Sequence, residues 1–372
     1  MTSQRRGSVQ DVIVVGGGLA GLTTALALAR ENISVKIIYD HQDPQAATPA
    51  CHGISTIKGI LESDAALFGL KLLGHRGFSA WLAGVEALLG QVRPESVWSV
   101  GVAERFPNRQ DFQKDIGWIY RKDFTGAKQV VLRTEKKDNY VEAYYPGDWW
   151  IDPSYLTTTL RSAAIRLGVK TLDAVVKKIT TSDKDVTLTL STGEVCQSAR
   201  VVLCGGANIV TLLSMAGVQK YDWFAVPGYT YKAVYDFPET CLVKRTSGLT
   251  SKAGTLHWGA ASETAISLQR PTAGALDSIC PTTKLARIRT KEEEALVAEV
   301  HLHKFMGGHY LTDFQNVQVR FGVRVRNRSR SPAIDRVKEL DDGGIWINAG
   351  YYKSGIILAW MMAEDLTSQI LG

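Results

Sequence analysis

Cysteine is scarce in this chain, and no two cysteines form a C-x-x-C pair. Five cysteines are spread over 372 residues, a number that is both small and odd. Neither a disulfide framework nor a zinc site of ordinary spacing is therefore indicated. Internal repeats and low-complexity tracts are absent as well. From this cysteine usage we expect a reducing, cytoplasmic location.

A large excess of one charge is also lacking. The chain has 43 Lys and Arg residues against 37 Asp and Glu, which leaves a net charge of +6. So small an excess on a protein of this size favours anionic ligands over committed binding of nucleic acid. Hydrophobic residues make up 45% of the sequence, enough for a substantial core. The length favours one large α/β domain with an inserted layer, or two domains.

No transmembrane segment or export signal is indicated. The one long apolar stretch near the start covers residues 12–29, but a glycine cluster interrupts it and no A-x-A-type cleavage site follows. A glycine cluster at a junction between strand and helix has a different physical role, which the flanking residues define.

A strand, a glycine turn, a helix and a second strand follow one another within about thirty residues. Residues 12–15 form a continuous β-branched run, as a strand buried on both faces requires, and residues 35–39 form a second short run. A G-x-G-x-x-G motif stands between them at Gly16, Gly18 and Gly21. These glycines allow a tight turn, a close approach of the backbone to a pyrophosphate, and close packing of helix on strand.

Two further features of this unit point to a dinucleotide. The helix that begins at Leu19 and Ala20 would direct its free N–H groups and its dipole at the phosphates. Asp40 ends the second strand, about twenty residues after the glycines, where a carboxylate can accept hydrogen bonds from ribose hydroxyls. The motif and the acidic residue together predict a bound dinucleotide, and NAD would satisfy them as well as FAD.

Regular elements are also predicted downstream. Asp152 and Pro153 signal the start of a helix that ends at Gly168, since Asp is a good N-cap and Pro is tolerated in the first turn. Residues 97–145 show no clear period, and short strands are expected between residues 221 and 259. The other predicted elements are helices over residues 64–90, 290–306 and 358–370 and strands over residues 186–190, 201–204, 317–326 and 345–348.

The sequence resembles the superfamily of FAD-dependent D-amino-acid oxidases and glycine oxidases over nearly its whole length. Residues 11–40 look like the family's first FAD segment, residues 321–324 are similar to its Gly-Leu-Arg-Pro element, and residues 348–359 resemble its C-terminal flavin loop. The similar segments between them are residues 147–156, 176–179 and 201–208. Order and spacing both agree with the family.

The resemblance implies an α/β fold of the glutathione-reductase type. It consists of a Rossmann-like FAD-binding domain with an inserted α+β substrate domain built on an antiparallel sheet. The expected FAD-binding domain comprises residues 1–62, 149–218 and 329–372, and the expected substrate domain comprises residues 63–148 and 219–328.

The resemblance also implies a set of FAD contacts, non-covalent rather than covalent. The helix that follows Gly350 would point its N-terminus at the pyrimidine end of the flavin, where negative charge accumulates on reduction. His52 stands beside Gly53, not three residues before it as in histidyl-linked relatives, and Val325 occupies the place of the cysteine in cysteinyl-linked ones. The implied contacts are Gly16, Gly18, Leu19, Ala20, Gly21, Asp40, Cys51, His52, Gly53, Val176, Gly205, Gly350, Lys353, Ser354 and Gly355.

Arg324 is the residue that the resemblance assigns to a substrate carboxylate. Gly322 and Arg324 share a face of the predicted strand, so the missing side chain leaves room beside a guanidinium that can bind a carboxylate bidentately. Other arginines stand close by, and a basic run is more often a solvated or interaction face. Tyr229 and Trp258 lie in segments that resemble those covering the flavin in the family, and they are the other expected substrate contacts.

The sequence departs from the family pattern at the substrate end. Residues 248–251 read Gly-Leu-Thr-Ser where amino-acid oxidases carry Tyr-x-x-Pro, and Val325 replaces the usual proline after the arginine. The spacing from Arg324 to Pro332 is closer to the oxidase half of the enzyme that finishes aminomethyl-uridines in tRNA. This spacing raises a macromolecular substrate as an alternative.

Together these features favour an FAD-dependent oxidation of a small amine or amino acid. A hydride would leave a carbon that bears a neutral amine and the imine would hydrolyse outside the site, so no catalytic base is assigned. Oxygen or another electron acceptor would reoxidise the flavin. Two alternatives stay open: a flavoenzyme acting on tRNA or a protein side chain, and a flavin-binding component without turnover. No metal site is predicted, because His301 and His303 point apart on a helix and His309 lies beyond two glycines.

Overall fold

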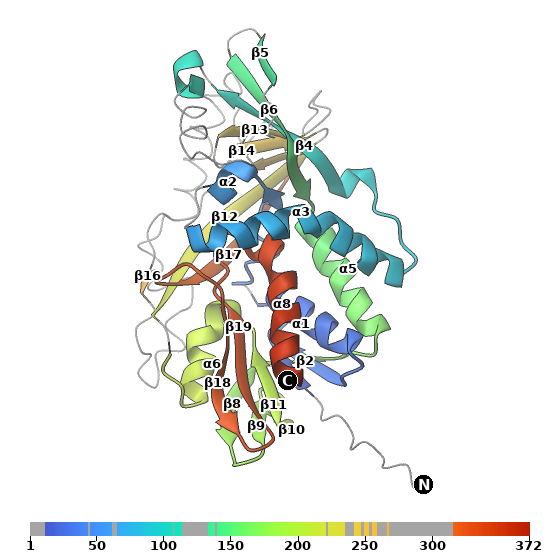
Figure 1. The fold of residues 1–372 in the computed structure, drawn as a ribbon, viewed down its shortest axis with the longest axis vertical. Helices are drawn as coiled ribbons and strands as arrows, with labels where there is room; N and C mark the ends of the chain where they lie inside the picture. The colour runs from blue at the N-terminus through green and yellow to red at the C-terminus, as the bar shows by residue number, and fades with distance from the viewer. Residues whose placement is uncertain are drawn as a thin grey trace.

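The computed structural model describes residues 12–43, 45–61, 65–106, 108–113, 133–137, 140–220, 222–234, 242–246, 249–252, 255–258, 266–267 and 315–372. One large sheet occupies the lower half of the molecule and another occupies the upper half (Figure 1). Within the described ranges, the helices are all too short or too polar to cross a membrane. The helix predicted over residues 290–306 lies outside these ranges.

A six-stranded sheet forms the lower half of the molecule (Figure 1). Its strand order is β18-β19-β11-β1-β2-β7, and neighbours run parallel except β18 and β19. β1 lies in the interior of the sheet, and all of its β-branched residues are buried, as the sequence predicts. The strands are β1 (Val12–Val15), β2 (Val35–Tyr39), β7 (Lys170–Asp173), β11 (Arg200–Leu203), β18 (Ala333–Leu340) and β19 (Gly343–Ala349).

Different elements pack on the two faces of this sheet. Successive side chains of β1 point to opposite faces and so belong to two separate core clusters. Val12 and Val14 pack against α1 (Leu19–Arg30), α3 (Ala65–Leu88), α5 (Pro153–Arg166) and α8 (Gly355–Leu371). Ile13 and Val15 pack on the other side, against a small antiparallel sheet and α6 (Ile209–Met215). That small sheet consists of β8 (Val176–Thr181), β9 (Val186–Leu190) and β10 (Val195–Ser198).

Helix α5 begins where the sequence predicts. Asp152 is its N-cap, and the Asp152 Oδ1 atom accepts hydrogen bonds from the backbone N–H groups of Ser154 at 2.8 Å and Tyr155 at 3.2 Å. Pro153 takes the first helical position, where its missing N–H costs nothing. Asp152 Oδ2 also accepts a 3.2 Å hydrogen bond from Lys232, so this helix start is tied to the second sheet.

The second sheet is built mainly from antiparallel pairs. Its path runs β16-β12-β15-β14-β13-β4-β6-β3, with β17 paired to β12 and β5 paired to β6, and only the β13–β4 pair of these described strands is parallel. The strands are β3 (Ile54–Ser55), β4 (Trp98–Phe106), β5 (Arg133–Lys137), β6 (Tyr140–Ile151), β12 (Trp223–Val234), β13 (Leu242–Thr246), β14 (Leu249–Lys252), β15 (Thr255–Trp258), β16 (Ile266–Ser267) and β17 (Gln315–Asn327).

Two sequence predictions in this sheet are corrected. β4 lies within the stretch that shows no clear period, and β6 begins in it. Their pairing shifts register between Val100 and Val102, where residues 146–148 of β6 lie opposite Gly101 and interrupt the alternation. β12 is a single strand of 12 residues where several short strands are predicted, because it pairs along its length with β17. The strand predicted over residues 317–326 is confirmed as β17.

The architecture as a whole is of the predicted class. A helix-covered, mainly parallel sheet carries the glycine turn, and a mainly antiparallel sheet stands beside it. The sheets are joined where β12 and β17 pack on the parallel sheet, since Ala225 and Val323 share a core cluster with Val15 and Leu203. The residue boundaries of the two domains stay a prediction.

Candidate active site

The turn between β1 and α1 requires glycine at two positions. Gly16 has a φ of +119°, and a Cβ atom there would lie 2.3 Å from the carbonyl oxygen of Cys204. A Cβ atom at Gly21 would lie 1.8 Å from the carbonyl oxygen of Gly16. The backbone therefore closes tightly on itself at both places and directs the first N–H groups of α1 out of the turn.

Thr48 lies at the start of α1 and was not among the predicted site residues. Its hydroxyl oxygen accepts a 3.0 Å hydrogen bond from Leu19 N–H, although 29 positions separate the two residues. A Cβ atom at Gly18 would lie 3.4 Å from this oxygen. The absence of a side chain at Gly18 therefore leaves room for the Thr48 hydroxyl beside the start of α1. The only sequence signal for Thr48 is its place in the loop that contains Cys51 and Gly53.

The segments predicted to bind the adenosine half lie together. Asp40 is exposed at the end of β2, and its Oδ1 atom accepts a 2.8 Å hydrogen bond from Gln42 N–H. Ala174 N–H donates to Tyr39 O at 3.2 Å, which places the start of β8 at Val176 beside the same strand end. Gly205 follows β11 next to the glycine turn, since Cys204 N–H donates to Val15 O at 2.7 Å.

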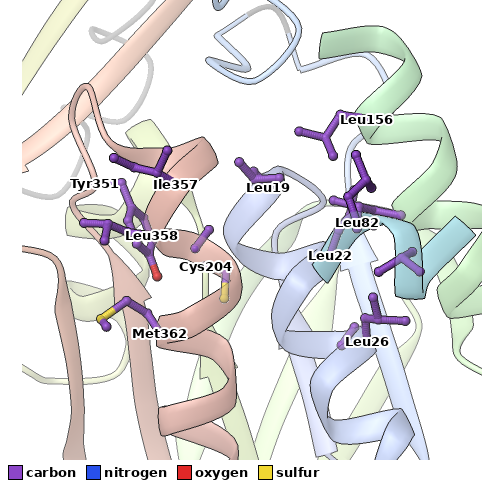
Figure 2. Close-up of a cluster of buried hydrophobic side chains, with 14 of the residues drawn as sticks. Leu19, Leu22, Leu26, Leu82, Leu156, Cys204, Tyr351, Ile357, Leu358 and Met362 are labelled. Carbon is purple, nitrogen blue, oxygen red and sulfur yellow. The ribbon is translucent and has the colours of Figure 1, made fainter. Parts of the chain in front are cut away.

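A buried chain of hydrogen bonds joins the loop before α8 to helix α1. The Tyr351 hydroxyl donates to Asn348 Oδ1, and the Asn348 amide donates to Thr24 Oγ1 at 2.9 Å. Thr24 in turn donates to Ala20 O at 2.7 Å. Figure 2 shows Tyr351 beside Ile357 and Leu358 of α8, in the same buried cluster as Leu19 at the start of α1. The sequence gives no sign of this network.

The loop before α8 is shaped by backbone conformations that few residues adopt. Gly350 has a φ of +86°, and a Cβ atom there would lie 3.0 Å from the ring of Trp223. Tyr352 has a φ of +52°, unusual for a residue with a side chain. Ser354 is the N-cap of α8 but its side chain makes no capping hydrogen bond, and the helix continues from Gly355. The N-terminus of α8 therefore presents uncapped N–H groups.

Arg324 lies where this loop and the Thr48 loop both meet β17. Gly322 packs so closely on the Thr48 loop that a Cβ atom there would lie 2.7 Å from Ala50 Cβ, and Val323 N–H donates to Gln45 O at 3.0 Å. On the other side, Tyr352 N–H donates to Val325 O at 3.1 Å. The structure thus brings Arg324 of the second sheet to both loops that the sequence assigns to the flavin.

The charge of Arg324 is not paired with a carboxylate of the described residues. The side chain is half-buried, and among the described residues no carboxylate lies within 4 Å of its guanidinium. Burial lowers the pKa of Arg324, and the nearest aromatic ring is that of Tyr352, whose centroid is 5.4 Å from Arg324 Cζ. A half-buried guanidinium without a counterion is a ready site for an anion.

Cys51 and His52 are close to this cation and are held uncharged. Burial raises the pKa of the Cys51 thiol to about 11. Burial, with a smaller contribution from the nearby Arg324, lowers the pKa of His52 to about 4. At neutral pH the thiol is therefore protonated and the imidazole is neutral, so neither group competes with Arg324 for an anion.

Three neighbouring arginines, two on β17 and one just after it, have local partners instead. Arg320 donates to Pro49 O at 2.9 Å and to Ser154 Oγ at 3.0 Å. Arg326 stacks over the ring of Phe224 at 4.6 Å. Arg328 lies 3.5 Å from Asp222 in an exposed ion pair. Arg324 differs from these three because its side chain makes no hydrogen bond or ion pair within the described part of the chain.

The other predicted contacts are located only in part. Tyr229 lies on β12 and Trp258 on β15, but the side chains of both residues lie outside the described part of the structure. Lys353 is exposed, and its Nζ atom is 5.4 Å from the centroid of the Tyr352 ring. The histidines at 301, 303 and 309 also lie outside the described residues.

Comparison with known proteins places this geometry in a family. A family model described as DAO, FAD dependent oxidoreductase, matches residues 11–369. The chain belongs to the DAO family. FAD is the cofactor of this family, which decides between the two dinucleotides that the glycine motif alone would accept. A search of curated proteins finds no match.

Solved structures of DAO-type flavoenzymes share the fold. An iminodiacetate oxidase from Chelativorans sp. BNC1 has 18% sequence identity and a TM-score of 0.75, covering 97% of this chain and 95% of that chain. A glycine oxidase from Geobacillus kaustophilus has 18% identity and a TM-score of 0.74, with the same coverage of 97% and 95%. An L-amino acid deaminase from Proteus vulgaris has 16% identity and a TM-score of 0.69, covering 100% and 95%. The predicted fold class and family are confirmed.

Proposed function

We propose that this chain oxidises a C–N bond of a small amine or amino acid that carries a carboxylate. The observation that carries the proposal is Arg324, a half-buried cation without a described carboxylate partner, at the meeting point of the two loops expected to contact the flavin. The names of the similar structures, an iminodiacetate oxidase, a glycine oxidase and an amino acid deaminase, support a donor of this chemical class.

The residues around the two helix starts fit FAD. The glycine turn of α1 would bind the pyrophosphate, because the start of a helix attracts negative charge and the glycines carry no side chain that would block the approach. Thr48, whose hydroxyl accepts a hydrogen bond from Leu19 N–H, stands beside this turn. Asp40 would accept hydrogen bonds from the ribose hydroxyls. The uncapped start of α8 would face the flavin ring. Bound FAD supplies the hydride acceptor, which oxygen or another electron acceptor then restores.

The protein's own part in the reaction is positioning. Arg324 would bind the substrate carboxylate bidentately, which fixes the position of the adjacent carbon and its hydrogen. The amine must be neutral when the hydride leaves, and the imine product hydrolyses in water. No side chain is assigned as a base, and His52, neutral at pH 7, is not required to accept a proton.

A macromolecular substrate is the less well supported alternative. The spacing from Arg324 to Pro332 raised it, and an arginine-rich strand would suit the phosphates of tRNA. Arg320 and Arg326 are engaged with local partners, and Arg328 is paired with Asp222. The strand therefore offers fewer free cations than the sequence alone suggests, and Arg324 is more accessible to a small carboxylate than to a phosphate backbone.

An anaerobic reduction screen tests the proposal. The yellow, FAD-loaded protein is mixed without oxygen with amino acids, N-methyl amines and hydroxy acids, and loss of the flavin absorbance is followed. We expect reduction by a carboxylate-bearing amine. Arg324→Met should raise the donor concentration needed for half-maximal reduction at least about thirtyfold. Arg326→Met is the matched control, since it removes an arginine two positions along the same strand, and it should change little.

The two parts of the proposal can fail separately. If no compound of the three classes reduces the flavin, a small-molecule donor is wrong. If a donor reduces the wild type and Arg324→Met behaves like Arg326→Met, the reaction stands but Arg324 is not the anchor. A colourless protein that takes up no FAD would contradict the cofactor assignment as well.

A further inference from the structure

Tyr352 occupies a conformation that costs energy. Its φ of +52° lies in the left-handed region, where a residue with a side chain is destabilised by roughly 1–2 kcal/mol. Such a conformation persists only where the surroundings fix it, and it is often found at binding sites. Here the fixing contact is the 3.1 Å hydrogen bond from Tyr352 N–H to Val325 O on β17.

This hydrogen bond ties the backbone of Tyr352 to the residue next to Arg324. Because the bond ends at Val325, the backbone from which the Tyr352 ring projects stays close to Arg324 while the bond is intact. The guanidinium carbon lies 5.4 Å from the ring centroid, within the range of a cation–π interaction. Lys353 Nζ lies at 5.4 Å from the same centroid, but Lys353 is exposed whereas Arg324 is half-buried. The ring therefore matters more for Arg324, which has less water around its charge.

Arg324 needs such a partner when no ligand is bound. A cation with reduced access to water is destabilised unless something compensates its charge, and no described carboxylate does so. An acidic residue would neutralise the charge of Arg324, but it would also occupy the N–H groups that a substrate carboxylate needs. The face of an aromatic ring attracts the guanidinium without occupying its N–H groups.

We propose that Tyr352 is a positioning residue for Arg324: its ring holds the guanidinium in place, with its donors free, before a carboxylate binds. The inference rests on the proposed function, since it assumes that Arg324 binds a carboxylate. It assigns a role to a residue that was not among the predicted contacts. The ring, not the hydroxyl, carries this role, and the left-handed backbone is what places the ring.

Binding of acetate to the FAD-loaded protein, followed as a change in flavin absorbance, tests this role. Tyr352→Phe keeps the ring and should bind acetate within about twofold of wild type. Tyr352→Leu and Tyr352→Asn remove the ring and should weaken acetate binding by about three- to thirtyfold, the range expected for a lost cation–π contact. Asparagine tolerates the left-handed backbone, so agreement between these two variants separates loss of the ring from backbone strain.

The chain offers a matched control. Arg326 stacks on Phe224 at 4.6 Å on the same strand pair, so Phe224→Leu removes an equivalent ring from under an arginine not assigned to the substrate. This variant should bind acetate as the wild type does. FAD content and melting temperature are measured for each variant, so that only folded, FAD-loaded protein is compared.

The outcomes separate this inference from the proposed function. If Arg324→Met abolishes acetate binding while Tyr352→Leu and Tyr352→Asn bind as well as wild type, the positioning role is wrong and the proposed function stands. If acetate binding is the same with and without Arg324, Arg324 is not the carboxylate anchor and the positioning role is wrong with it, whereas the reaction itself is tested by the reduction screen. Equal weakening by Phe224→Leu and Tyr352→Leu would also overturn the positioning role, because the effect would then not be specific to Arg324.

Discussion

Replacing Thr24 with valine and Thr367 with valine makes the same chemical change at two buried sites, one where the hydroxyl is hydrogen-bonded and one where it is not among the described residues. Thr24 is 0% exposed, and its hydroxyl accepts from Asn348 Nδ2 and donates to Ala20 O. Thr367 of α8 is 4% exposed, and its hydroxyl has no hydrogen-bond partner among the described residues. Valine keeps the shape of threonine, so each substitution mainly removes a hydroxyl.

The expected magnitudes follow from what each hydroxyl leaves behind. Thr24→Val leaves the amide of Asn348, itself 0% exposed, without its acceptor, and an unsatisfied buried donor costs about 1–3 kcal/mol. Thr367→Val leaves nothing unpaired and removes a buried polar group. The free energy of unfolding should therefore fall by about 1–3 kcal/mol for Thr24→Val and stay constant or rise by up to about 1 kcal/mol for Thr367→Val.

Urea unfolding at saturating FAD measures both effects, with an unchanged urea dependence as the sign that the unfolded states are comparable. Asn348→Leu in the Thr24→Val background serves as a further check, since the two changes should destabilise by less than the sum of the single variants. An equal loss of stability for Thr24→Val and Thr367→Val would refute the reasoning. So would strict additivity of Thr24→Val and Asn348→Leu.

Two other predictions concern the glycine turn and the buried imidazole. Gly21→Ala places a Cβ atom 1.8 Å from Gly16 O, so this variant should bind FAD poorly in a spectroscopic titration. The control is Gly84→Ala, in open space on α3, which should retain FAD and gain about 0.5–1 kcal/mol in its free energy of unfolding. Equal FAD binding by the two variants would contradict this prediction. Burial lowers the pKa of His75 from its ordinary 6.5 to about 4, so the unfolded chain binds more protons between these values, and stability should fall as the pH is lowered through that window. Urea unfolding at pH 7 and pH 5 measures this loss of stability, and His75→Gln should make it smaller. Part of the loss should remain, because the pKa of His52 is lowered too. A loss of the same size in His75→Gln and wild type would be the contrary result.

The sequence predicted those parts of the fold whose signals are local. The β-branched run of β1, the glycine turn and the Asp152 cap each depend on a few adjacent residues, and all three are present in the structure. β4 and β6 were missed because residues 146–148 of β6 bulge opposite Gly101, which itself has a positive φ, and so break the alternation by which a strand is recognised. Thr48 was missed for a different reason, since its hydrogen bond to Leu19 spans 29 residues and leaves no local pattern.

Two adjacent residues in the loop before α8, Tyr351 and Tyr352, also show what a sequence can and cannot predict. A resemblance could place the loop near the flavin, yet it could not tell which tyrosine faces which way. Tyr351 turns its hydroxyl inward to Asn348 and so joins α8 to α1, while Tyr352, forced into the left-handed region, turns its ring toward Arg324. One backbone conformation thus sets both the internal anchor of the loop and its contact with the proposed substrate cation. For this reason Tyr351→Phe should act on stability, whereas Tyr352→Leu should act on carboxylate binding, although the two residues are neighbours in the chain.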